Sequence, residues 1–240
     1  MTLEQHIQHL HGIFGERNDL LMRRPEQRLA FLTAGIRRLE DAYEEEDRDK
    51  YGIRLASVFA RWCAIVAFLD TDKFYITQAM AAKYGGACAY CKQLPCDCPR
   101  KSRAKAQTAV ISDDRLSWGL REWQGHLGAL YGEKNQARGV DFILRRLFSE
   151  EAEAMSNWFV STLSPANRRS PLDPFNHELL TELCDVLAWT IAAANMLNIN
   201  LEDVANQHYG QGCPSCKSPV CKCTVLSSHS MSFRDETSTV

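Results

Sequence analysis

Apolar residues dominate two long stretches of the chain, and shorter amphipathic segments lie between them. Residues 54–69 (RLASVFARWCAIVAFL) and 177–197 (HELLTELCDVLAWTIAAANML) contain neither Gly nor Pro. Stretches of this length predict helices that are buried on most of their circumference, because strands are shorter and alternate in polarity. Residues 198–200 predict a break before a new helix. A further helix is predicted by apolar residues at helical spacing: Ile143, Leu147, Ala154 and Trp158. We find no run of period two, so the expected class is all-α.

Two parts of the chain resemble each other. The pattern C-x2-C-x4-C-x-C occurs in YGGACAYCKQLPCDC and again, 125 positions later, in YGQGCPSCKSPVCKC. The segment HLHGIFGERN, from His9, also matches HLGALYGEKN, from His126, at an offset of 117. Between these matches, residues 31–36 align with 142–147 and residues 55–62 with 182–189. These similarities predict a tandem duplication that forms a pseudo-dimeric helix bundle.

The duplication sets the expected domain boundaries. We expect one repeat at residues 1–99, a polar linker at 100–114, a second repeat at 115–224 and a tail at 225–240. The tail is rich in Ser and Thr and poor in apolar residues, so it is predicted to be disordered.

The cysteine pattern favours structural zinc. Four thiolates suit a tetrahedral Zn²⁺ with no open coordination position, and the Gly and Pro residues around them suit tight turns. The spacing leaves open whether each repeat closes its own site or the two repeats exchange ligands, and a thiol-redox role is the minor alternative. Cys63 and Cys184 lie on apolar helices and are expected to be core residues. The predicted zinc ligands are Cys88, Cys91, Cys96 and Cys98 in one repeat, and Cys213, Cys216, Cys221 and Cys223 in the other.

Four acidic residues distinguish the second repeat from the first. They form two pairs at i, i+3 spacing, so each pair lies on one face of a helix. At the aligned positions the first repeat has apolar Leu39, Ala42, Leu55 and Val58, which predicts that all four positions face inward. Four carboxylates inside a bundle would repel one another unless a cation offset their charge. Mg²⁺ prefers oxygen ligands and also keeps water and phosphate oxygens, so a metal–phosphate site is predicted at Glu150, Glu153, Glu182 and Asp185.

The acidic pattern resembles a known family. Glu150-x-x-Glu153 followed by Glu182-x-x-Asp185 is similar to the E-x-x-E…E-x-x-D signature of the MazG-like all-α nucleoside triphosphate pyrophosphohydrolases. The helices around it, LRRLFSEEAEAM and ELCDVLAWTIAAANMLNINLEDV, resemble that family's helices too. Because of the run from Glu150 to Glu153, Glu151 is a rival ligand. We prefer Glu150, which is in line with Ile143 and Leu147.

The resemblance implies an activity and a set of roles. Family members use Mg²⁺ to split a nucleoside triphosphate into monophosphate and pyrophosphate, and Glu153 or Glu150 would activate the attacking water. The first repeat, lacking the acids, resembles a degenerate half. Family members are dimeric or higher, so a homodimer of this chain would form a pseudo-tetramer. The candidate catalytic and Mg²⁺-binding residues are thus the four acids, and the candidate substrate-binding residues are Lys134, Asn135, Arg138, Arg145, Trp189 and Asn195.

Net charge and the lengths of the apolar runs bear on binding to nucleic acid, binding to membranes and localisation. The net charge of −2 disfavours strong attraction to nucleic acid or to anionic membranes. We find no apolar run of about 18 residues and no secretion signal, so a cytoplasmic protein without a membrane span is expected. Two alternatives stay open: a zinc-knuckle protein that binds nucleic acid through the basic segment PRKSRAK, and a non-catalytic nucleotide-binding protein.

Overall fold

The computed structural model describes residues 1–69, 75–98, 113–163 and 177–223. Within these ranges all regular secondary structure is helical, which confirms the all-α class. Most of the predicted linker, the basic segment PRKSRAK from residue 99, and the predicted tail lie outside the described residues. The elements are α1 (Leu3–Leu21), α2 (Pro25–Glu44), α3 (Arg48–Leu69), α4 (Tyr75–Tyr84), the 3₁₀ helix η1 (Asp113–Ser117), α5 (Leu120–Arg138), α6 (Val140–Leu163), α7 (His177–Met196) and α8 (Leu201–Tyr209).

Local sequence signals account for several helix ends. The Thr2 side chain accepts a hydrogen bond from the Gln5 backbone N–H, and the Gln5 side chain accepts one from the Thr2 N–H, which together cap α1. Pro25 occupies the first position of α2, where no backbone donor is needed. The Asn200 side chain caps α8 by accepting from the Asp203 N–H at 3.1 Å, which confirms the predicted break. Gly139, with φ of +79°, separates α5 from α6 in a conformation that disfavours other residues.

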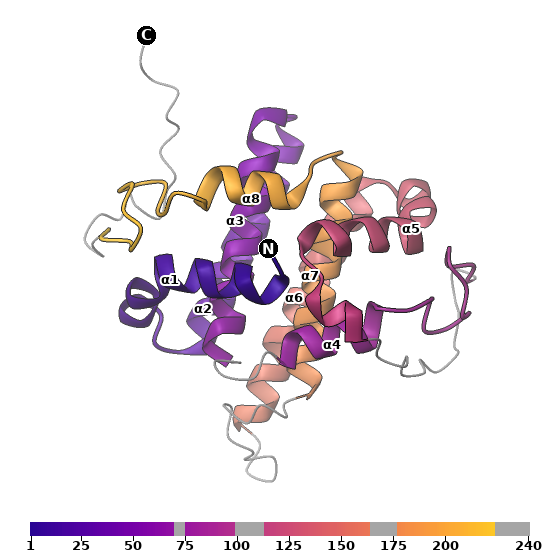
Figure 1. Cartoon of the computed structure of the whole chain (residues 1–240), viewed down its shortest axis with the longest axis horizontal. Coiled ribbons are helices and arrows are strands. Elements are labelled where there is room, and N and C mark those ends of the chain that lie inside the picture. Colours follow the sequence, from indigo (N-terminus) through magenta and orange to yellow (C-terminus); the bar gives the residue numbers. More distant parts are fainter. Residues whose placement is uncertain (70–74, 99–112, 164–176, 224–240) are drawn as a thin grey trace.

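Helices α3 and α7 form the centre of the molecule, where they run beside each other (Figure 1). Most side chains of α3 from Leu55 to Ala67 are fully buried, as the apolar run predicts. The Trp62 indole of α3 donates a hydrogen bond to the Leu183 carbonyl of α7 at 2.8 Å, which satisfies a polar group inside the core. The two central helices are thus joined by both apolar packing and a buried hydrogen bond.

The two halves of the chain are interleaved around this centre. We call residues 1–98 the N-terminal half and residues 113–223 the C-terminal half. Within the halves, α1 and α2 pack on α3, and α5 and α6 pack on α7. The short helices cross over, because α8 packs on α3 and α4 packs on α7. Figure 1 shows α8 lying across α3 and α4 lying against α7.

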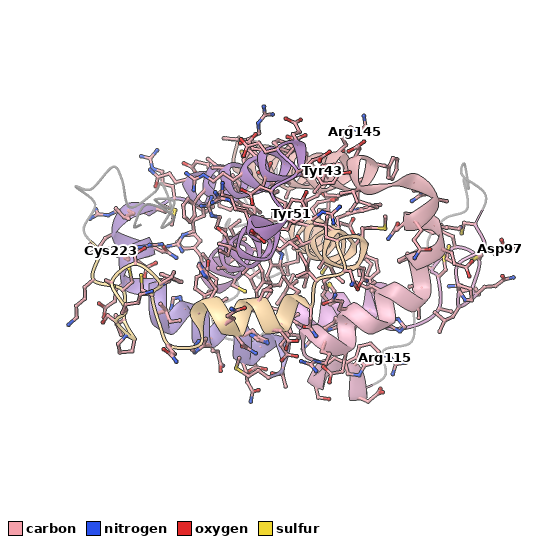
Figure 2. The ribbon with its side chains drawn as sticks, turned by 90° about the horizontal axis from the view of Figure 1, so that it is seen from above. Tyr43, Tyr51, Asp97, Arg115, Arg145 and Cys223 are labelled. Atoms are coloured by element: carbon pink, nitrogen blue, oxygen red, sulfur yellow. The ribbon has the colours of Figure 1, made fainter. Side chains whose placement is uncertain are left out.

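The segments that carry the cysteines cross over in the same way. The Cys96 N–H donates to the Leu130 carbonyl of α5 at 2.9 Å, and the Cys221 N–H donates to the Ile13 carbonyl of α1 at 2.7 Å. Cys223 and Asp97, which belong to these two segments, lie at opposite ends of the molecule (Figure 2). Each cysteine segment is therefore attached to the first helix of the other half.

The expectation about apolar runs needs a correction. By length and composition alone, Arg48–Leu69 and Glu178–Met196 would each suffice to cross a membrane. Of the most apolar window in each helix, 72% and 61% is buried inside the protein. A core helix of a bundle meets the same test, because it too is apolar on most faces.

Candidate metal centres

Three carboxylates from two neighbouring helices converge in the C-terminal half. Glu150 and Glu153 lie one turn apart on α6, and Glu182 lies on α7, which packs against it. One carboxylate oxygen of each residue lies within 4.8 Å of those of the other two. Such a group offers several oxygen ligands to one divalent cation.

Glu150 is the most buried member of this group, with 4% of its surface exposed. Its carboxylate accepts a hydrogen bond from the Arg146 guanidinium, one turn earlier on α6. Burial, followed by the negative charge of Asp185, raises the pKa of Glu150 to about 7, although Arg146 opposes the shift. A cation placed among these acids would relieve both effects by stabilising the ionised form.

The other two glutamates are held more loosely. The Glu182 carboxylate accepts a hydrogen bond from the Asn157 amide of α6 at 3.3 Å. Burial and the charge of Asp185 raise the pKa of Glu182 as well. Glu153 is exposed and accepts from the Ser149 hydroxyl at 3.2 Å. Accessible oxygens of this kind suit a site that must admit both an ion and a substrate.

Asp185, the fourth predicted acid, has partners of its own. The Lys83 ammonium group lies 2.5 Å from its carboxylate, and the Tyr84 hydroxyl donates a hydrogen bond to the same oxygen. Burial, together with the charge of Asp185, raises the pKa of Tyr84 well above its usual range. Both partners come from α4, so the N-terminal half supplies side chains to the acidic site of the C-terminal half.

The rival ligand Glu151 points to a different neighbour. Its carboxylate accepts a hydrogen bond from the Thr33 hydroxyl of α2 at 2.7 Å, and the residue is buried. Burial raises the pKa of Glu151, and the Thr33 hydrogen bond opposes the shift. The structure thus brings Glu150, and not Glu151, together with Glu153 and Glu182.

Two of the predicted substrate-binding residues have partners elsewhere. The Lys134 ammonium lies 3.2 Å from the Cys96 sulfur and 2.5 Å from the Cys98 carbonyl, at a cysteine cluster. The Asn195 amide donates to the Gln124 carbonyl of α5 at 3.1 Å, so it joins α7 to α5. The second contact explains why a polar residue lies on the largely apolar helix α7.

The remaining candidates are distributed around α6. The Arg138 guanidinium lies over the Phe142 ring, 5.0 Å from its centroid, and the Trp189 ring meets the edge of Phe142 at 6.2 Å. Asn135 is buried on α5. Arg145 is exposed at the edge of the molecule (Figure 2). Trp189 is linked to the acids through Arg146. The Arg146 guanidinium lies over the Trp189 ring, 5.7 Å from its centroid, and donates a hydrogen bond to Glu150.

Sequence reasoning missed several residues of the acidic site. Asn157 lies four residues after Glu153, so helical spacing could have placed it on the same face. Arg146 lies four residues before Glu150 and carries the same signal. Lys83 and Tyr84 carry no such signal, because only the packing of α4 on α7 brings them to Asp185.

The eight predicted zinc ligands form two separate four-sulfur groups. In the first, the Cys88 and Cys98 sulfurs are 3.6 Å apart; in the second, the Cys213 and Cys223 sulfurs are 3.8 Å apart. Four sulfurs at about 2.3 Å from a tetrahedral Zn²⁺ would be separated by about 3.8 Å. Each group could therefore hold a zinc ion with ligands from its own half alone, although its segment is attached to the other half.

Donors around the sulfurs favour the thiolate form. The Asp97 N–H donates to the Cys91 sulfur at 3.3 Å, and the Lys222 N–H donates to the Cys216 sulfur at 3.4 Å. Burial raises the pKa of Cys91, but the backbone donors outweigh it and lower that pKa to about 6. The same balance lowers the pKa of Cys216 to about 6. Burial and the neighbouring sulfurs instead raise the pKa of Cys98 to about 12 and raise that of Cys223 well above its usual range. Each group therefore combines one thiolate that is ready to bind metal with a thiol that must lose its proton when metal binds.

Comparison with protein-family models, with characterised proteins and with solved structures gives no match to this chain.

Proposed function

We propose that this protein is a Mg²⁺-dependent nucleotide pyrophosphohydrolase that converts a nucleoside or deoxynucleoside triphosphate into the monophosphate and pyrophosphate. The active site would lie in the C-terminal half, one per chain. The observation that carries the proposal is the convergence of Glu150, Glu153 and Glu182 from α6 and α7. The similarity of these residues and Asp185 to the signature of the MazG-like family supports the same function.

The chemistry of these side chains suits Mg²⁺ better than a soft metal. Mg²⁺ takes a few carboxylates and fills its other positions with water and phosphate oxygens. When bound, it would neutralise the triphosphate and acidify a water molecule. Glu150 or Glu153 would orient that water toward the α-phosphorus and accept its proton.

Asp185 and Lys83 would complete the site. In the proposed working state, Asp185 would be the fourth acidic ligand, joining the three glutamates that converge, while its Oδ1 atom stays in contact with Lys83 and Tyr84. Lys83 is half-buried beside these acids and carries the positive charge that a departing pyrophosphate needs. It would thus take the role that the sequence prediction gave to Lys134.

We further propose that the two halves are tandem MazG-like repeats, of which the first is degenerate and completes a pseudo-dimer. The crossed contacts support this relation because they occur in pairs at matched positions. His126 Nε2 lies 2.7 Å from the Tyr84 carbonyl oxygen, and His9 Nε2 lies 3.2 Å from that of Tyr209. These pairs have the same offsets, 117 and 125, as the sequence matches. The two zinc ions would be structural, the protein cytoplasmic, and a homodimer would form a pseudo-tetramer.

The direct test is incubation of the purified, zinc-loaded protein with nucleoside and deoxynucleoside triphosphates and Mg²⁺. We expect monophosphate and pyrophosphate as products. Glu182→Gln and Asp185→Asn should each lower kcat at least about 100-fold, because each removes a charge that holds the metal.

The matched control is Glu178→Gln, which removes an exposed acid from the first turn of the same helix. It should leave the rate unchanged, and circular dichroism should show that all three variants are folded. Wild-type rates in the Glu182 and Asp185 variants would contradict the proposed site. Tight nucleotide binding without any product would instead favour the non-catalytic alternative.

A further inference from the structure

A cavity lined by arginine lies where the N-terminal half meets the last described segment of the C-terminal half. It has a volume of about 60 Å³ and lies between α1, α2, α3, the end of α8 and the start of the second cysteine segment. This volume is several times what a single buried water requires. Its polar lining consists mainly of Arg17, Asn18, Ser57, Arg61 and Tyr209.

Positive charge is concentrated around this cavity. Arg61 has only 4% of its surface exposed. Burial and, to a smaller extent, the positive charges of Arg38, Arg17 and Arg54 together lower the pKa of Arg61 to about 10, although Tyr209 opposes the shift. Among the described residues, no carboxylate forms an ion pair with Arg61 or with Arg17. A buried guanidinium without a counter-charge is costly, so the arrangement favours binding of an anion.

Hydrogen-bond donors at the site also remain unused. Arg17 lines the cavity, and its Nε group is buried and has no hydrogen-bond partner among the described residues. The Arg61 side chain is held in place by one hydrogen bond to the Phe31 carbonyl at 2.6 Å and by stacking on the Phe31 ring at 3.9 Å. Its stem lies so close to Gly35 that a Cβ there would approach the Arg61 Cδ to 2.7 Å. The guanidinium is thus fixed before any ligand binds.

The two arginines of this cavity have no arginine counterparts in the C-terminal half. At the positions aligned with Arg17 and Arg61, the C-terminal half has Lys134 and Ala188. Lys134 contacts a cysteine cluster, and Arg17 does the same through its Nη1 group, 3.9 Å from the Cys221 sulfur. A thiolate at Cys221 would balance part of the positive charge of Arg17, but this contact does not involve Arg61.

We propose that this cavity is a binding site for a phosphate group. The planar guanidinium of Arg61 suits the oxygens of phosphate. Arg17 adds positive charge and one unused donor, its Nε group, while its Nη1 and Nη2 groups contact Cys221 and Asn18. The hydroxyls of Ser57 and Tyr209 line the same cavity. The ligand is either a free inorganic anion, such as phosphate or pyrophosphate, or the phosphate end of a nucleotide. The site is separate from the acidic cluster, which repels anions when no metal is bound.

The test uses the full chain, loaded with zinc and kept free of Mg²⁺. Inorganic phosphate, pyrophosphate and a nucleoside triphosphate are titrated separately by calorimetry, and thermal unfolding is followed in parallel. We expect saturable binding at one site per chain, with a rise in Tm as ligand is added. Tighter binding of pyrophosphate would identify the free anion as the ligand, and tighter binding of the triphosphate would identify the nucleotide.

Three variants locate the site. Arg61→Met should weaken binding at least tenfold, and Ala64→Leu should do the same by filling the cavity while every charge is kept. Arg37→Met, which removes an exposed arginine of α2 paired with Glu40, should bind as the wild type does. The proposal is overturned if the Mg²⁺-free protein binds none of the three anions, or if Ala64→Leu and Arg61→Met both bind normally. Because no Mg²⁺ and no turnover are involved, this result is independent of the proposed hydrolysis.

Discussion

The helix pairs α2–α3 and α6–α7 place different chemistry at aligned positions. In α2 and α3 these positions hold Leu39, Ala42, Leu55 and Val58, all of them buried. In α6 and α7 they hold the four acids, and three of these come together. If the two pairs are repeats of one scaffold, as proposed, a few substitutions are enough to replace buried hydrocarbon by a group of acids that could hold an ion. The comparison also shows that the acid-free pair gains a different polar feature, the arginine-lined cavity.

The largest expected effect concerns a feature that both halves of the chain share, the cysteine clusters. Cys88→Ser and Cys213→Ser should each lower the zinc content from two ions per chain to one. Structural zinc contributes about 10 kcal/mol or more to folding in small zinc domains, so we expect a large fall in Tm for both variants. Elemental analysis and thermal unfolding would measure the two effects.

The control for the zinc variants is Cys63→Ala, which removes a buried thiol of α3 that belongs to neither cluster. This variant should keep two zinc ions and lose less stability. If Cys88→Ser loses zinc but Cys213→Ser does not, the two clusters are not equivalent. That result would contradict the proposal that both halves carry the same structural zinc site.

A smaller effect should follow when the difference between the helix pairs is exchanged. Leu55→Glu places a carboxylate in a fully buried position of α3, and among the described residues no candidate metal-binding group includes a residue of this helix. The substitution should cost about 3–5 kcal/mol of unfolding free energy. Glu182→Leu should be neutral or stabilising in the absence of Mg²⁺, because it removes repulsion among the acids. Urea unfolding of both variants measures the contrast, and a destabilised Glu182→Leu would show that the acids hold the fold together.

The smallest effect is a difference in pH dependence between the acidic and the apolar pair. Glu150 has an ordinary pKa of 4.5 and a folded-state pKa of about 7. Its protonated form therefore contributes stability that is complete below pH 4.5 and is lost as the pH rises through 7. Integrated over this interval, the contribution is about 3 kcal/mol.

Glu150→Gln should remove this loss, so the difference in unfolding free energy between wild type and variant should grow from pH 5 to pH 8. Saturating Mg²⁺ should abolish the loss of wild-type stability between pH 5 and pH 8, because the ion stabilises the ionised carboxylate. Leu39→Gln, at the aligned position of α2, provides no titrating group and should show no such trend. A wild type and a Glu150→Gln variant with parallel pH profiles would contradict the raised pKa.

The sequence predicted what depends on local pattern. The apolar runs predicted α3 and α7, Asn200 predicted the start of α8, and the cysteine spacing predicted two four-sulfur groups. The i, i+3 acids predicted a shared helical face. Each of these features depends on the type and spacing of residues within one short segment, which can be read directly from the sequence.

Contacts between distant elements could not be predicted. Nothing in the sequence around Lys83 indicates that it reaches Asp185, or that Lys134 reaches a sulfur. The hydrogen bond from Thr33 that separates Glu151 from its acidic neighbours depends on how α2 packs on α6. Such contacts depend on how the helices are placed relative to one another, and the periodicity within a single helix contains no information about that placement.

The crossing of α4 and α8 has a consequence for how the chain is made. During synthesis, α3 emerges early but receives its α8 cover only after nearly all of the described chain has left the ribosome. Either half expressed by itself would expose apolar surface on its central helix, α3 or α7, and would be prone to aggregation. A chain cut between the halves should therefore recover a soluble, zinc-loaded product only when both fragments are co-expressed.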